Sequence, residues 1–118
     1  MKFEPDLCRV EDALNIIVGK WKPIILLHLL QAGTQRFSEL KSHMPGITQK
    51  MLTKQLRELE EEDIVVRKVY AQVPPKVEYS ITEYGRTLEP ILHAMHEWGT
   101  KHQAHREQKE RNTKTILE

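Results

Sequence analysis

The sequence predicts a mainly α-helical domain, of the α+β class because a β-hairpin precedes its last helix. Apolar residues recur at helical spacing within residues 10–30 and 88–98, and two short runs rich in β-branched residues, 65–71 and 77–81, flank a pair of prolines. With 118 residues, 39% of them hydrophobic, the chain has room for one modest core. We expect an N-terminal arm over 1–9, the domain over 10–99, and a charged tail over 100–118 that is either a frayed helical extension or disordered.

The first two helices are predicted by apolar spacing and by their end signals. Val10, Leu14 and Ile17 share one helical face, and Gly19 is a natural stop. Pro23 suits the first position of a second helix, which is apolar on most sides as far as Leu30 and should therefore lie at the centre of the core.

A third and a fourth helix follow after short turns. We expect a short strand at Arg36-Phe37, then Ser38 as the cap of a helix over 39–43. Thr48 should cap the fourth helix, with Ile47 and Leu52 in the hydrophobic-staple arrangement. The predicted buried stripe of this fourth helix consists of Leu52, Leu56 and Leu59.

The hairpin and the last helix complete the predicted order of elements. Pro74-Pro75 must lie in the loop between the strands because proline cannot donate to a sheet ladder, and Thr82 should cap the long last helix. Two helices, a short strand, two helices, two strands and a helix is the order of a winged helix-turn-helix with additional N- and C-terminal helices. The outer helices carry more apolar surface than one small domain can cover, which predicts a homodimer with an interface of Val10, Leu14, Ile17, Leu88, Ile91, Leu92, Met95 and Trp98.

The fourth helix has basic residues towards its start and acidic residues at its end. In a helix-turn-helix the second helix enters the major groove of DNA with its N-terminal residues on base edges. Gln pairs well with adenine and Lys with guanine, whereas a residue further along meets phosphate. The candidates are Thr48, Gln49, Lys50, Thr53 and Lys54 for bases and Arg57 for phosphate. A surface helix with a solvated charged face fits the same charge pattern.

The hairpin favours the DNA interpretation. Its basic residues, Arg67, Lys68 and Lys76, flank a stiff tip that holds Gln72, Pro74 and Pro75. A stiff loop loses less conformational entropy when it docks on a phosphate backbone. An ordinary hairpin with prolines in its loop is the alternative. Helix and hairpin together favour double-stranded DNA as the partner.

Other classes of protein fit less well. A winged helix used only for protein–protein interaction usually has apolar residues where the fourth helix is basic. An enzyme is not expected, since the chain has no phosphate-binding glycine loop and no Ser/His/Asp signature, and no cofactor is implied. No apolar run approaches the roughly 20 residues that span a bilayer, and no signal-peptide stretch is present, so we expect a cytoplasmic protein without a membrane partner.

Residues 8–98 resemble the HxlR-type winged-helix transcription regulators, relatives of the MarR group. The matching stretches are 13–21, 36–40, 45–53, 56–60 and 73–82. The resemblance implies a homodimer that binds a pseudo-palindromic operator as a repressor or activator. Two positions depart from the family pattern: Asp63 stands where glycine is usual, and Lys76 stands where arginine is common. Aspartate tolerates the left-handed conformation needed after a helix, whereas lysine cannot make the bidentate phosphate contact of arginine.

Cys8 is the one cysteine of the chain and cannot form an intramolecular disulfide. The resemblance implies that it senses quinones, aldehydes or oxidants. A helix N-terminus favours the thiolate, and Arg9 adds positive charge, although Asp6 and two further acids oppose it. A small packed residue without a signalling role is the alternative.

Histidines and tryptophans are the remaining candidates for ligand sites. His93/His96 and His102/His105 are spaced i, i+3, but a metal site needs three or four ligands of suitable geometry, so no metal is expected. Trp21 and Trp98 are expected to anchor the core or an interface rather than line a ligand pocket.

Overall fold

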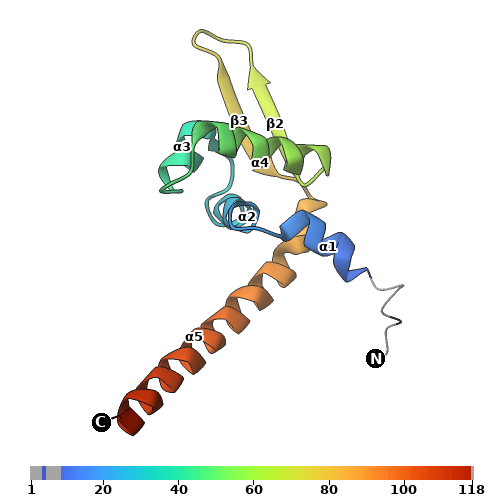
Figure 1. Cartoon of the computed structure of the whole chain (residues 1–118). Helices are drawn as coiled ribbons and strands as arrows, with labels where there is room; N and C mark the ends of the chain where they lie inside the picture. Colours follow the sequence, from blue (N-terminus) through green and yellow to red (C-terminus); the bar gives the residue numbers. More distant parts are fainter. Residues whose placement is uncertain (1–3, 5–8, 118) are drawn as a thin grey trace. The chain divides into compact units, whose positions relative to one another are not determined.

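The structure, a computed structural model, describes Glu4 and residues 9–117 and divides into two compact units. The first unit ends at Thr87 and the second begins at Leu88 (Figure 1). The elements of the first unit are α1 (Val10–Ile17), α2 (Trp21–Ala32), β1 (Gln35–Arg36), α3 (Phe37–Ser42), α4 (Gln49–Glu61), β2 (Val65–Tyr70) and β3 (Lys76–Ile81). A 3₁₀ turn, η2 (Gly85–Leu88), spans the boundary, and α5 (Glu89–Leu117) forms the second unit.

The core of the first unit is centred on α2, as its apolar sequence predicts. Ile25, Leu26 and Leu29 have no exposed surface, and α2 contacts both α4 and β3. From the α4 side come the three leucines of the predicted stripe, all at most 1% exposed: Leu52, Leu56 and Leu59. Helix α4 also contacts β2, and the loop end of the hairpin extends beyond α4 in Figure 1.

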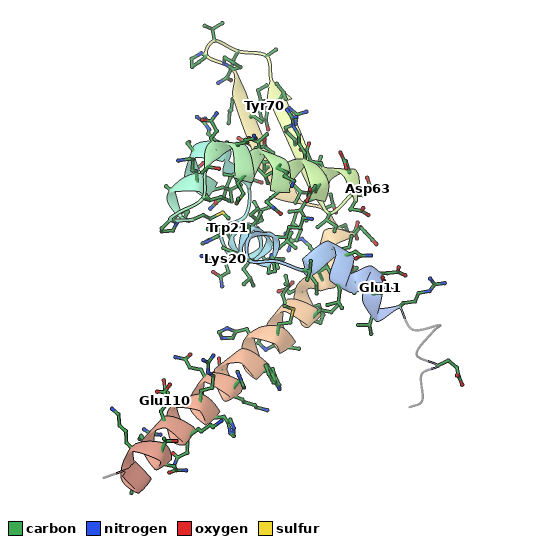
Figure 2. The ribbon with its side chains drawn as sticks, in the orientation of Figure 1. Glu11, Lys20, Trp21, Asp63, Tyr70 and Glu110 are labelled. Carbon is green, nitrogen blue, oxygen red and sulfur yellow. The ribbon has the colours of Figure 1, made fainter. Side chains whose placement is uncertain are left out.

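Both ends of α4 are closed by side-chain and backbone hydrogen bonds. Thr48 is the N-cap and its Oγ1 accepts from the Met51 N–H at 3.1 Å, which confirms the sequence prediction. At the other end Asp63, labelled in Figure 2, has a φ of +62°. The N–H groups of Asp63 and Ile64 donate to the carbonyls of Glu60 and Leu59, each at 3.0 Å. This is a Schellman closure in which aspartate occupies the left-handed position usually given to glycine.

The sheet has three antiparallel strands in the order β1-β3-β2. The hairpin register runs from Val65 opposite Ile81 to Tyr70 opposite Lys76, so alternate residues point to opposite faces. One face contributes three buried residues to the core: Val65, Tyr79 and Ile81. The other face carries Lys68, Tyr70, Lys76 and Glu78.

The start of α3 and several other boundaries differ from the sequence predictions. Ser38 was expected to cap α3, but the N-cap is Arg36, whose backbone N–H donates to Glu39 Oε1 at 3.0 Å. The reason is that Gln35 and Arg36 pair with β3, so the chain enters the helix directly from the strand and Ser38 falls inside the first turn. The strand lies one residue earlier than predicted, and α2 begins at Trp21 rather than at Pro23.

Thr82 joins the end of α4 to the end of the hairpin. Its hydroxyl donates to the Asp63 carbonyl at 2.6 Å and accepts from the Gly85 N–H at 2.8 Å, while its backbone N–H donates to the Ile64 carbonyl at 2.9 Å. Thr82 was expected to cap the last helix. It caps the short turn η2 instead, because four residues of 3₁₀ helix precede α5.

Helix α5 continues through Gly99 to Leu117, so residues 100–117 take the helical alternative of the two considered for the tail. Within the described part of the chain, no single helix combines the length and hydropathy needed to cross a bilayer. Helices α1 and α2 reach that composition only as a pair bent by 78°.

We predict that Gly85→Ala destabilises the domain. A Cβ at this position would collide with the Ile64 carbonyl oxygen and lie 2.8 Å from Ile81 Cγ1. Overpacking of this kind costs about 1–3 kcal/mol. Gly99→Ala is the matched control, since nothing lies within 4 Å of its added Cβ and alanine suits a helix interior. Urea denaturation should show a lower midpoint for Gly85→Ala alone; equal midpoints for the two variants would contradict the packing argument.

Candidate nucleic-acid interface

The exposed face of α4 is basic because the opposite face is committed to the core. The leucine stripe is buried, which turns Gln49, Lys50, Lys54 and Arg57 to solvent, with Thr53 half-buried between them. A shallow groove runs along this face, lined by Gln49, Lys50, Thr53, Lys54, Arg57, Glu58 and Glu61. The structure therefore brings together the predicted residues of this helix on one accessible surface.

Two of the predicted base-reading residues have hydroxyls that are already engaged. Thr48 Oγ1 caps the helix, as described above, and Thr53 Oγ1 donates to the Gln49 carbonyl at 2.8 Å. Each hydroxyl keeps part of its hydrogen-bonding capacity, since Thr48 Oγ1 retains its hydrogen and Thr53 Oγ1 retains acceptor sites. The other predicted base-reading residues of this face are Gln49, Lys50 and Lys54.

Glu58 is neutralised by a lysine that the sequence interpretation did not single out. Lys22 of α2 places its Nζ 2.7 Å from Glu58 Oε2, and the Lys22 side chain is only 15% exposed. The hydrogen bond from Lys22 lowers the pKa of the Glu58 carboxyl below its usual range, against a smaller opposing effect of desolvation. The pair spans two helices, so no local spacing in the sequence could have indicated it.

Arg67, predicted as one of the basic DNA-binding residues of the hairpin, forms an ion pair within the fold. Its Nε lies 3.1 Å from Glu60 Oε1, which ties β2 to the acidic end of α4. Tyr79 lies directly opposite Arg67 in the hairpin register, and burial, followed by the Glu60 charge, raises the pKa of the Tyr79 phenol. The Arg67 side chain remains 50% exposed, so it is still partly accessible to solvent.

Lys68 and Lys76 lie on the other face of the hairpin around one aromatic ring. Each Nζ is 4.9 Å from the centre of the Tyr70 ring, within the range of a cation–π contact. Lys76 Nζ is also 2.7 Å from Glu78 Oε1, and this hydrogen bond lowers the pKa of the Glu78 carboxyl. Tyr70 and Glu78 were missed, although the i, i+2 spacings Lys68/Tyr70 and Lys76/Glu78 place each pair on one face of a strand.

The loop of the hairpin is solvent-exposed, and its prolines lie outside the paired strands, as the sequence predicts. Gln72, Pro74 and Pro75 are all exposed, and the Gln72 N–H donates to the Tyr70 carbonyl at 3.0 Å. The predicted tip residues are thus accessible at the end of the hairpin, clear of the paired strands.

The residues predicted for a dimer interface divide by exposure. In the first unit Val10 is 58% and Leu14 48% exposed, whereas Ile17 is buried. Of the residues on the last helix, Ile91, Met95 and Trp98 are exposed, Leu88 is half-buried and Leu92 is 3% exposed. Ile17 and Leu92 therefore offer little surface to a partner. An apolar patch on α5 consists of Pro90, Ile91, Ala94, Met95 and Trp98.

Two further sequence interpretations concern cysteine and histidine. Cys8 lies outside the described residues. Where the structure is described, no three His, Asp or Glu side chains gather as a metal site would need. His93 pairs with Glu97 at 3.0 Å, and His102 stacks on Trp98 with ring centres 4.9 Å apart.

Comparison with known proteins identifies the family. The model of the family described as HxlR-like helix-turn-helix matches residues 16–107, and the chain belongs to this family. The HTH-type transcriptional regulator YdeP of Bacillus subtilis is 58% identical over 95 residues, which cover 80% of this chain and 73% of that protein.

Two solved structures are also similar to this chain. The redox regulator HypR in its reduced form has a TM-score of 0.77 at 56% identity, covering 81% of this chain and 94% of HypR. The diamide-treated YodB of B. subtilis has a TM-score of 0.67 at 35% identity, covering 86% of this chain and 96% of YodB.

Proposed function

We propose that this protein is a transcription regulator that reads double-stranded DNA with α4 and holds the flanking phosphates with its hairpin. The observation that carries the proposal is the exposed basic face of α4, opposite a leucine stripe that is at most 1% exposed. The relatives named as HTH-type transcriptional regulators support it. Gln49, Lys50 and Lys54 contact base edges, and the methyl groups of Thr48 and Thr53 contact thymine methyls.

The phosphate contacts come from cations further from the bases. Arg57 lies beyond the base-reading residues of α4, and Lys68, Lys76 and the partly exposed Arg67 lie on the hairpin. Gln72, Pro74 and Pro75 form the tip that approaches the backbone. These contacts orient the protein on the duplex without reading its sequence.

The regulator acts as a homodimer on a pseudo-palindromic operator. Each unit by itself offers exposed apolar residues to a partner: Val10 and Leu14 on α1 of the first unit, and Ile91, Met95 and Trp98 on α5 of the second. A two-fold dimer presents two copies of α4 to half-sites about 34 Å apart. Its proposed compartment is the cytoplasm, where the chromosome lies in bacteria such as the source of the relative YdeP.

Cys8 is proposed as the site where an oxidant or electrophile changes DNA binding. It is the one cysteine of the chain, and the structurally similar HypR and YodB are described as a redox regulator and a diamide-treated regulator, respectively. An adduct or intersubunit disulfide at this residue would alter how the two chains present their recognition helices to the fixed spacing of the half-sites.

Base and phosphate contacts should respond differently to mutation. Lys54→Ala or Gln49→Ala should weaken operator binding more than non-operator binding, by about 1–3 kcal/mol for a bidentate base contact. Lys76→Ala should weaken both equally and make the salt dependence shallower by about one unit per half-site. Fluorescence anisotropy on operator and scrambled duplexes measures both. An even loss in all three variants contradicts the assigned roles, and no binding of any duplex favours a protein–protein interaction module.

The homodimer should be visible by light scattering at micromolar concentration. Trp98→Ser should shift the protein towards monomer, because it removes the most exposed large side chain of the α5 patch. Tyr84→Ser is the matched control, since Tyr84 is 64% exposed and lies outside that patch. A monomeric wild type, or an equal effect of the two substitutions, would contradict the proposed dimer interface.

Diamide should change the operator affinity of the wild type by about fivefold or more, the usual scale of coupling between two sites. Cys8→Ser should bind operator with the wild-type affinity and show no response. A Cys8→Ser variant that still responds, or a wild type that never does, would leave Cys8 as a packing residue.

A further inference from the structure

We propose that Glu78 is a built-in counter-ion of the hairpin, which pairs with Lys76 in the free protein and lowers its affinity for DNA phosphate. This inference rests on the proposed function, because it concerns how the hairpin meets the DNA backbone. It makes Glu78 a residue that acts through Lys76 rather than one that contacts DNA itself.

The strand register places Glu78 among three cations on one face of the sheet. Glu78 lies opposite Arg36 of β1 and opposite Lys68 of β2, and two residues from Lys76 on its own strand. Residues directly opposite one another in antiparallel strands share a face. The strand residues that share this face are Arg36, Val66, Lys68, Tyr70, Lys76, Glu78 and Ser80. Glu78 is the one carboxylate among them.

The carboxylate is held in place from two sides. Glu78 Oε1 is 2.7 Å from Lys76 Nζ, and Glu78 Oε2 accepts from the Tyr70 hydroxyl at 3.4 Å. The Tyr70 ring, labelled on the hairpin in Figure 2, also lies 4.9 Å from the Nζ atoms of Lys68 and Lys76. Tyr70 thus links the counter-ion to both lysines of this face.

A phosphate that approaches Lys76 must compete with this carboxylate. Both anions seek the same ammonium group, and two like charges within a few ångströms repel. The Lys76 side chain is 29% and the Glu78 side chain 20% exposed, so water reaches the pair and its attraction is screened. Phosphate can therefore displace Glu78, and the carboxylate reduces DNA affinity without blocking it.

The other ion pair of the hairpin, between Arg67 and Glu60, lies on the opposite face of the sheet from Lys76 and Glu78. Arg67 and Glu60 join β2 to α4 on the face that carries Tyr79. That pair connects two elements of the fold, whereas Lys76 and Glu78 are neighbours on one strand and can separate without moving any element.

The test is Glu78→Gln, measured by anisotropy on operator and scrambled duplexes. We expect affinity for both duplexes to rise about threefold to tenfold at about 50 mM salt, with their ratio unchanged, because phosphate no longer has to displace the carboxylate from Lys76. The salt dependence should stay close to that of the wild type, because Lys76 contacts phosphate in both proteins. Glu62→Gln, an equal change in charge at the exposed C-cap of α4, should have a smaller effect.

A second pair of variants isolates Lys76. In a Lys76→Gln background, adding Glu78→Gln should leave affinity unchanged, since the cation through which Glu78 acts is gone. An equal gain with and without Lys76 would reduce Glu78 to a general charge effect and overturn the proposal. A loss of affinity in Glu78→Gln would overturn it too, because the pair would then position Lys76 for phosphate. If the wild type binds neither duplex, the proposed function itself fails, and this inference fails with it.

Discussion

The packing of α4 against α2 determines how every proposed contact surface of the first unit is presented. Helix α2 contributes Ile25, Leu26 and Leu29, which are wholly buried, and α4 contributes its three buried leucines. Burial of a leucine side chain contributes about 1.5–3 kcal/mol, whereas an exposed ion pair contributes about 0–1 kcal/mol. The leucines therefore set the rotation of α4 about its axis. Since each residue turns a helix by about 100°, a shift of the buried positions by one residue would bury Arg57 in one direction and Glu58 in the other.

Local rules account for the parts of the fold that the sequence predicted well. The N-cap at Thr48, the left-handed Asp63 and the prolines outside the sheet all depend on residues within one turn of the chain. The error at Ser38 has a non-local cause, because the pairing of Gln35 and Arg36 with β3 determines where α3 begins. A serine near a helix start caps it only if the helix begins at the next residue, and here α3 begins at Phe37, before Ser38.

The sequence predicted the residues of the candidate site, but not the ion pairs that neutralise some of its charges. The cations of α4 and the hairpin are apparent in the sequence, yet two of the hairpin cations have partners, Arg67 with Glu60 and Lys76 with Glu78. Lys22, which neutralises Glu58, belongs to a helix that carries none of the proposed contacts. Ion pairs between elements follow from packing, so a count of basic residues overstates the positive charge that a helix or hairpin presents. The roles of Cys8 and of a second copy depend on features beyond one folded chain and stay predictions.

The hydroxyl of Thr82 has a mechanical consequence. It bonds the carbonyl that follows α4 and the turn that follows β3, so the end of the helix and the base of the hairpin share one fixed joint. A helix and a hairpin joined in this way keep a fixed distance between their DNA-facing surfaces. For a duplex bound as proposed, the distance from the major groove to the flanking backbone must match this fixed distance. Sequences whose groove width or stiffness departs from it would be bound less well even where no side chain touches a base.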